Sequence, residues 1–407
     1  MLPWLAWLGI LGVFVALRAR GVGHLLMWDE AMDLASVRAW VTSSRDAFSN
    51  AFWAHPPLFP LLLARLAPLR TGFAERAEGL SIAVQAVNLF LLFVLNRRLF
   101  GSAIALLACA ALAGLPGAVF FDAWIKRDHL VVTFGLLALL ALDRRRGLMA
   151  GILLGFALLA KESALFYLAA VLVLVPLAFK RGERVKNAAA ILATAAATSV
   201  WWYVLFSTFS GTYLRFALGR DPGLSGWNQP WTYYLERTWL DVGPVALAVL
   251  AAGLGTWVVA RWRASRSASH ATLSRNPQGS GFGVQFSIFN LQYSTSWPWA
   301  LLIPAYLYLG LARGKAPWLT MCLYPAWATL IGLAAHELLA AISRFQLPVF
   351  GRATAKKNGG GVLLSVPPPR CCCWRSSYRP RFVTFQAISP GSGSASSGAP
   401  RHPARRR

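Results

Sequence analysis

Negative charge is scarce in this chain. Only 15 of its 407 residues are Asp or Glu, against 40 Lys and Arg, and charged residues make up only 14% of the total. Hydrophobic residues make up 57%, and 18 residues are Trp. A soluble domain of this length needs far more charged surface. The composition therefore excludes a soluble globular protein and indicates an all-α integral membrane protein.

The signatures of several enzyme classes are also missing. The chain has no P-loop, dinucleotide fingerprint, CxxC pair or Ser/His/Asp grouping, so nothing indicates that it hydrolyses ATP. Two of its five cysteines, Cys109 and Cys322, lie in apolar stretches, and the other three are the consecutive 371–373. That spacing is typical of neither a zinc site nor a disulfide framework. No basic residue precedes the first apolar run, which favours an uncleaved first span over a signal peptide.

The net charge of +25 does not indicate a nucleic-acid partner, because of where the charge lies. The segment 344–407 holds 12 of the 40 Lys and Arg and no acid. Much of the remaining excess lies in short loops between apolar stretches. Basic short loops are typical of the cytoplasmic side of a membrane protein.

Apolar stretches long enough, or nearly so, to span the hydrocarbon at about 20 residues each predict a polytopic bundle of about ten transmembrane helices. They lie near 2–17, 80–95, 102–121, 129–142, 147–160, 163–179, 187–206, 242–260, 297–312 and 316–335.

Loop charge predicts the topology. The basic loops 96–101, 143–147, 180–187 and 261–267 fall on one side, which is then the cytoplasm. The opposite side receives the long first outer loop 18–79, the loop 207–241 and 12 of the 15 acids. The segments 31–41 and 58–69 of the first loop are expected to form juxtamembrane helices. This distribution predicts chemistry on the non-cytoplasmic face.

The stretch from Trp28 to Leu66 organises the outer face. It opens with WDEAMDL, which contains Asp29, Glu30 and Asp33, and it closes on AHPPLFPLLL, where His55 precedes Pro-Pro. Carboxylates beside a membrane span are costly unless they are solvated, paired or used. One interpretation is a site at the membrane surface; the alternative is that these acids only cap a juxtamembrane helix.

The outer face as a whole combines two kinds of group. A carboxylate can act as general base toward a hydroxyl, and Lys or Arg can hold a phosphate and neutralise its charge. Together they suit transfer of a group from a phosphate-bearing lipid to a hydroxyl. The alternatives are a solvated run at 126–128, a helix end at 161–162 and a snorkelling lysine at 315. The carboxylates are Asp29, Glu30, Asp122 and Asp128, and the cationic candidates are His55, Lys126, Arg127, Lys161 and Lys315.

These segments, in this order, resemble the GT-C superfamily of polytopic glycosyltransferases. The resemblance is to the bacterial ArnT-like branch of the protein-mannosyltransferase group, which uses polyprenyl-phosphate-linked sugars. It covers roughly 28–335. The segments that carry it are WDEAMDL (28–34), AHPPLFPLLL (54–63), the run 96–142, GILLGFALLAKESALF (151–166), NQPWTYYL (228–235) and GLARGKAPWLTMCLYPAWATL (310–330).

The resemblance implies roles for individual acids. Asp29 takes the position of the catalytic base, Glu30 is its companion, and Asp128 is similar to the acid of the second outer loop. The implied reaction inverts the anomeric centre of the sugar and releases polyprenyl phosphate outside the cytoplasm of a bacterial plasma membrane. The implied partners are the lipid-linked donor, a hydroxyl acceptor in the envelope and membrane lipids.

The resemblance also implies cationic contacts to the donor. His55 and Lys315 take positions near the donor phosphate, and Lys161 is similar to the lysine after the fifth span. Trp227 and Ala54 stand where some relatives have a histidine and a glutamate that can serve a metal. These departures argue against a metal, and no other cofactor is implied.

The C-terminal segment departs from the family as well. Residues 1–343 are expected to form the transmembrane transferase domain, and 344–407 a basic low-complexity tail without periodicity. We expect that a change of reading frame replaced the family's last spans with this tail. Two other functions stay open: a transporter or flippase for a lipid-linked sugar, and an inactive truncated homologue. The absence of an internal repeat and the acidic pair in the long first outer loop favour the enzyme.

Overall fold

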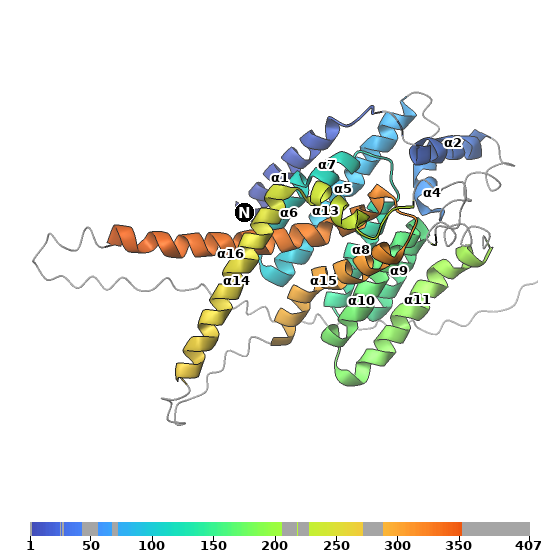
Figure 1. Ribbon diagram of the computed structural model, residues 1–407. Helices are drawn as coiled ribbons and strands as arrows, with labels where there is room; N and C mark the ends of the chain where they lie inside the picture. The colour runs from blue at the N-terminus through green and yellow to red at the C-terminus, as the bar shows by residue number, and fades with distance from the viewer. Residues whose placement is uncertain are drawn as a thin grey trace, which may run out of the picture. The chain divides into compact units, whose positions relative to one another are not determined.

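The computed structural model describes residues 2–24, 26, 28–42, 56–66, 72–205, 218, 228–271 and 288–351 (Figure 1). This part of the chain is built from helices, and its β pairing is one isolated bridge between Asn228 and Gly314. The prediction of an all-α architecture is confirmed. The helices, in chain order, are α1 (Leu2–Ala19), α2 (Trp28–Thr42), α4 (Leu58–Ala64), α5 (Phe73–Phe100), α6 (Ser102–Gly114), α7 (Pro116–Phe121), α8 (Asp128–Asp143), α9 (Gly147–Ala160), η1 (Glu162–Ala164), α10 (Leu165–Ala178), η2 (Arg181–Glu183), α11 (Arg184–Leu205), α13 (Tyr233–Val242), α14 (Pro244–Ala271), α15 (Ile288–Leu311), η4 (Pro317–Leu323) and α16 (Tyr324–Gly351).

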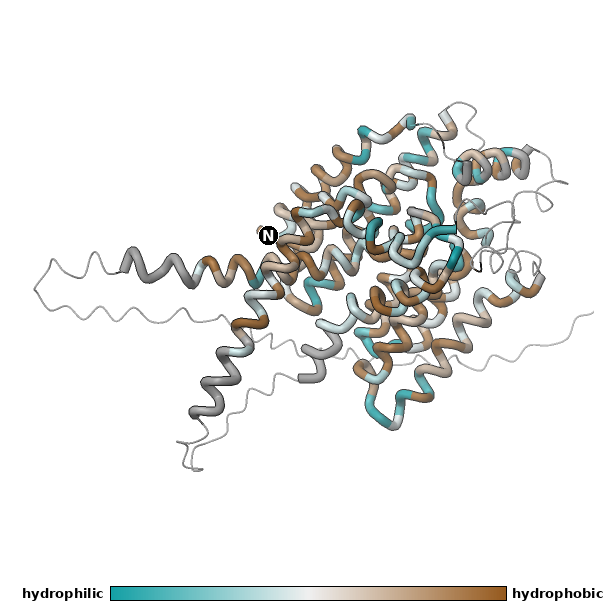
Figure 2. The backbone as a smooth tube through the Cα atoms, in the orientation of Figure 1, coloured by the Kyte–Doolittle hydropathy of each residue, from teal (hydrophilic) through white to brown (hydrophobic). Residues whose placement is uncertain are grey.

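Within the described residues the predicted apolar stretches lie on helices, but ten membrane crossings are not confirmed. The stretch 102–121 is divided between α6 and α7, and 316–335 between η4 and α16. Among the described residues, three helices are long and apolar enough to span a membrane: Leu2–Ala19, Phe73–Phe100 and Trp318–Ser343. A fourth candidate combines α13 with the first part of α14, which meet at a bend of 94°. The apolar helices α6, α9 and η1–α10 are shorter. Figure 2 shows hydrophobic residues along most of the helices and hydrophilic residues at several turns, such as that between α10 and α11.

Local sequence explains where several helices begin and end. Gly101, at a φ of 91°, separates α5 from α6, because a left-handed conformation suits glycine. Leu115 is extended before Pro116, as the residue before a proline prefers, and Pro116 then begins α7. Pro57 precedes the first residue of α4, which agrees with the expected helix start after Pro-Pro.

Some predicted boundaries differ from the structure. Helix α5 begins at Phe73 rather than near 80, because the helix-forming segment AERAEG extends the apolar run. Helix α16 continues to Gly351, well past 335, since hydropathy marks the apolar part of a helix and not its end. In the first outer loop α2 and α4 supply the two predicted helices, and α4 ends at Ala64 rather than 69.

Glycines allow close packing between α9 and α11. A Cβ atom at Gly151 would lie 2.0 Å from Thr194 Oγ1, and one at Gly155 would lie 2.4 Å from Thr198 Cβ. These contacts leave no room for any larger residue on that face of α9. The two helices therefore approach each other closely along the repeated small-residue positions of GLMAGILLG.

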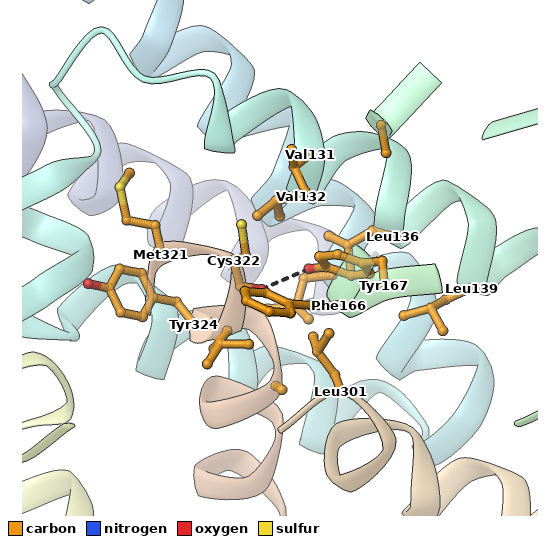
Figure 3. Packing of buried hydrophobic residues seen from close by; sticks show 14 of the residues in the cluster. Val131, Val132, Leu136, Leu139, Phe166, Tyr167, Leu301, Met321, Cys322 and Tyr324 are labelled. Atoms are coloured by element: carbon orange, nitrogen blue, oxygen red, sulfur yellow. Dashed lines mark hydrogen bonds between the residues drawn. The ribbon is translucent and has the colours of Figure 1, made fainter. Parts of the chain in front are cut away.

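The hydrophobic core joins helices from the middle and the end of the sequence. Figure 3 shows Val132 and Leu136 of α8 beside Phe166 and Tyr167, with Cys322 of η4 close by. The Tyr167 hydroxyl donates to the Cys322 carbonyl over 3.1 Å. This bond satisfies a polar group inside an apolar cluster and fixes η4 against the α8–α10 region.

The chain divides into a compact unit at 1–350 and a second unit at 351–407. The predicted tail 344–407 lies outside the described residues except for the end of α16. The predicted boundary at 343 stays a prediction.

Candidate active site

The loop between α7 and α8 carries a dense group of charges. Asp122, Lys126, Arg127 and Asp128 are all buried, with exposed fractions of 1%, 3%, 4% and 0%. A solvated run with an internal ion pair is therefore the wrong interpretation. Asp122, Arg127 and Asp128 have partners on other segments of the chain, which makes this loop the centre of the candidate site.

Asp128, the first residue of α8, pairs with the turn that follows α9. Its Oδ2 lies 2.6 Å from Lys161 Nζ, and its Oδ1 accepts from Ser163 Oγ over 3.0 Å. Burial raises the pKa of this carboxyl, but the charge and hydrogen bond of Lys161 outweigh it, so the pKa lies below its usual range. Asp128 is therefore an ionised partner that fixes Lys161.

Arg127 reaches the first outer loop. Its guanidinium pairs with both carboxylate oxygens of Asp33 on α2, through Nε at 3.1 Å and through Nη2. Within the described residues its buried Nη1 makes no hydrogen bond. A two-pronged contact of this kind fixes the guanidinium plane, and it leaves one donor group available to a ligand.

Glu30 joins the same two segments by a different contact. Its side chain is fully buried, and its Oε1 accepts the backbone N–H of Ile125 over 2.7 Å. Helix α2 thus contacts the 122–128 loop at Glu30 and again at Asp33, three residues later. The spacing of one helical turn brings both acids to the same face.

Lys126 lies near two tryptophan rings, one in its own loop and one on η4. Its Nζ lies 4.2 Å from the centroid of the Trp318 ring on η4 and 5.6 Å from that of Trp124. A lysine over a Trp face is stabilised by the ring quadrupole. Lys126 therefore links the loop to the segment that begins at Pro317.

Asp122 anchors the loop to the bundle. Its Oδ2 lies 2.7 Å from the guanidinium of Arg18 at the end of α1, and its Oδ1 accepts from Gln85. Arg18 also donates to the carbonyl of Ala113 over 2.8 Å. Sequence reasoning missed Arg18, although a buried arginine at the end of an apolar helix signals a nearby acid.

Lys315 lies at the end of α15. Its ammonium donates to the carbonyls of Leu309, over 2.6 Å, and of Ala312. These carbonyls are the unpaired acceptors of a helix C-terminus, where a cation is favourable. Burial lowers the pKa of Lys315. The predicted phosphate contact of Lys315 remains a prediction, because in this structure its donors are directed to α15.

Two further acids lie near this region. Glu162, beside Lys161, is buried, and burial raises its pKa to about 7. Asp241 on α13 lies 2.7 Å from Arg237 and accepts from Thr320 of η4 over 2.6 Å. Sequence reasoning missed Asp241, because only the fold brings α13 to η4.

Two predicted residues cannot be placed. His55 lies outside the described residues, and Asp29 belongs to α2 but its side chain is not described. Within the described part, no three His, Cys, Asp or Glu side chains come together in a way that could hold a metal ion. The predicted assignments of His55 and Asp29 stay predictions.

The chain resembles known proteins in sequence and in fold. Residues 54–206 match the family described as dolichyl-phosphate-mannose-protein mannosyltransferase. No curated protein matches the chain. ArnT from Cupriavidus metallidurans bound to undecaprenyl phosphate is 15% identical, with a TM-score of 0.56 over 84% of this chain and 62% of that one.

The apo state of the same ArnT gives 16% identity and a TM-score of 0.56, over 81% of this chain and 58% of that one. The apo oligosaccharyltransferase of Archaeoglobus fulgidus is 13% identical, with a TM-score of 0.48 over 85% and 51%. This chain therefore spans less than two thirds of the length of the ArnT structures. It shares their membrane fold, so the resemblance to polytopic GT-C proteins is confirmed at the level of the fold.

Proposed function

We propose that this chain is an integral membrane glycosyltransferase that moves a sugar from a polyprenyl-phosphate donor to a hydroxyl acceptor. The observation that carries the proposal is the buried cluster of charges from three separate segments: α2, the 122–128 loop and the turn after α9. Burying that many ionised groups is costly. Such a cluster is typical of a functional site in a membrane protein. The match to the mannosyltransferase family over 54–206 covers two of the three segments.

The proposed chemistry needs a base and a group that stabilises the leaving phosphate. Asp29 takes the acceptor proton, and the acceptor oxygen forms a bond to the anomeric carbon from the face opposite the phosphate. The bond between that carbon and the phosphate oxygen breaks, and its electron pair leaves with the polyprenyl phosphate. Inversion at the anomeric carbon follows from this single displacement.

Cations of the cluster are suited to hold the leaving group. The Nη1 group of Arg127 is a buried donor without a hydrogen bond among the described residues, and Lys161 is fixed by Asp128. Fixed cations stabilise the negative charge that grows on a leaving phosphate without having to reorganise. Asp128 is a poor base because its pKa is held down, so we assign it to orienting Lys161 and keep Asp29 as the base.

The proposed location of the reaction is the non-cytoplasmic face. Helix α8 supports this, because its two ends differ in character. Asp128 at its first residue belongs to the buried cluster, whereas Asp143 at its last residue pairs with the half-exposed Arg98. Arg98 lies in the last turn of α5, within the basic segment 96–101 that the positive-inside rule assigns to the cytoplasm. We also propose that the chain lies in a bacterial plasma membrane, because it is similar in fold to the bacterial ArnT structures.

The experiment uses purified protein in liposomes with a panel of polyprenyl-phosphate sugars and envelope acceptors. Mass spectrometry follows both glycosylated acceptor and free polyprenyl phosphate. Asp143→Asn, at the last residue of α8 and away from the buried cluster, makes the same chemical change and is the control for Asp29→Asn. We expect turnover by wild type and Asp143→Asn and loss of turnover in Asp29→Asn. Movement of intact donor between leaflets, unchanged in Asp29→Asn and without product, would instead identify a transporter.

A further inference from the structure

His24 lies at a junction of three segments around the proposed site. It follows the end of α1, and its ring stacks on Trp124 with centroids 5.7 Å apart and planes 15° apart. Its Nε2 lies 3.2 Å from Glu30 Oε2 on α2, and its Nδ1 lies 3.1 Å from Glu78 Oε1 on α5. One imidazole therefore bridges two carboxylates from different helices while it packs against the 122–128 loop.

The backbone holds the ring in this place. Gly23 has a φ of 82°, which a larger residue adopts only with strain, and its N–H donates to Glu78 Oε2 over 2.7 Å. A Cβ at Gly21 would lie 3.1 Å from Ala123 Cβ, so the turn also lies directly against the loop. Glu78 thus fixes both the backbone and the ring of this turn.

Glu30 connects His24 to the 122–128 loop of the proposed site. One of its oxygens faces His24 and the other accepts the Ile125 N–H over 2.7 Å. Ile125 immediately precedes Lys126, and Glu30 immediately follows Asp29. The ring therefore acts on the backbone of both the proposed base and the loop that carries the proposed phosphate-binding groups.

Both ring nitrogens of His24 face hydrogen-bond acceptors. The partners of the ring nitrogens are all acceptors: Glu30 at Nε2, and Glu78 and the Gly21 carbonyl at Nδ1. A neutral imidazole has one N–H and can donate to only one of the two carboxylates, whereas the imidazolium donates to both.

We infer that His24 is a positioning residue of the proposed transferase: its ring, held by Glu78, orients Glu30 and thereby sets Asp29 against the loop that carries Lys126. This inference rests on the proposed function. A displacement of about 1 Å at a reacting group can lower turnover about 100-fold. We expect His24→Gln, which cannot bridge two carboxylates as a cation, to lower kcat about 10- to 100-fold with a smaller change in KM.

The test compares wild type, His24→Gln, Glu78→Gln, the double variant and the control His336→Gln on α16. Initial rates of polyprenyl phosphate release are measured against donor concentration, so that kcat and KM are obtained separately. In His24→Gln the kcat of the folded protein should fall while KM changes less, whereas a variant that only misfolds would lose active protein without this change. The double variant should be no slower than the slower single variant, because both substitutions break one bridge. His336→Gln should match wild type.

Hydrogen–deuterium exchange supplies a readout that does not need activity. Exchange of the peptide that contains Ile125 should be faster in His24→Gln than in wild type or His336→Gln. Unchanged exchange, or an unchanged kcat beside an active wild type, would overturn the positioning role. A wild type that releases no polyprenyl phosphate would overturn the proposed function, and the role of His24 in it would fall as well.

Discussion

Substitution of Asp128 by Asn should destabilise the protein strongly. Asp128 is fully buried, and its Oδ2 lies 2.6 Å from Lys161 Nζ, which is itself almost fully buried. Removing one partner of a buried ion pair leaves an uncompensated charge and costs about 3–5 kcal/mol. The hydrogen bond from Ser163 to Oδ1 can persist with the Asn amide oxygen, so the main loss is the counter-charge of Lys161.

The control is at the other end of the same helix. Asp143 pairs with Arg98 over 2.8 Å, but the Arg98 side chain is 44% exposed. Pairs of this kind contribute about 0–1 kcal/mol. The two variants should therefore differ by about two to three decades in the unfolding equilibrium constant, at about 1.4 kcal/mol per decade. The assay is unfolding in mixed micelles, followed by tryptophan fluorescence.

A double variant tests whether the unpaired charge of Lys161 causes the loss of stability. Lys161→Met removes the ammonium that Asp128→Asn leaves unpaired, so the double variant should recover most of the lost stability. Two results would show that the unpaired charge of Lys161 is not the cause. One is an Asp128→Asn variant no less stable than Asp143→Asn; the other is a double variant whose loss equals the sum of the single losses.

Three further predictions concern packing, pH and the end of α15. Gly151→Ala should destabilise by about 1–3 kcal/mol, since its Cβ would clash with α11, whereas Gly9→Ala, with nothing within 4 Å, should be neutral or stabilising; thermal unfolding of both decides. The Glu162 pKa is raised by burial from 4.5 to about 7, so the native state holds this proton more tightly. The contribution of this proton to the free energy of unfolding, at most about 3 kcal/mol, is fully present below about pH 4.5 and is lost as pH rises through about 7. In Glu162→Gln the free energy of unfolding should depend less on pH over this range, which unfolding measured at several pH values checks. Lys315→Met should lower stability by about 1–3 kcal/mol, because it leaves carbonyls of α15 unpaired, and an unchanged melting temperature would contradict this.

The helices could be predicted because each depends on a local pattern. The apolar runs locate most of the helices, and Pro-Pro predicts the start of α4. The start of α7 at Pro116 was not predicted, because 102–121 was expected to be one stretch. The ends of α5 and α16 could not be predicted from hydropathy, because these helices continue through polar residues. Helix propensity, not apolarity, decides such ends.

The candidate site was predictable in composition but not in pairing. The charged residues 126–128, 161 and 30 were expected on one face, and the structure brings Asp128 to Lys161 and Glu30 to the 122–128 loop. The partners Asp33 and Arg18 could not be assigned, since each pair joins residues 94 or more positions apart. Such pairings depend on how helices pack, and no local pattern encodes them.

The same limit applies to His24. It lies near the acidic stretch in sequence, but its second partner, Glu78, is on α5. A histidine in a loop after an apolar helix gives no local signal of two carboxylate partners. The role inferred for it follows from the fold alone.

The most direct test of the account is a count of polyprenyl phosphate released per protein molecule from a polyprenyl-phosphate sugar in the presence of acceptor. We expect many turnovers for wild type and for Asp143→Asn, and almost none for Asp29→Asn. Equal release by wild type and Asp29→Asn would contradict the assignment of the base. No release by wild type with any donor would contradict the proposal that this chain is a glycosyltransferase.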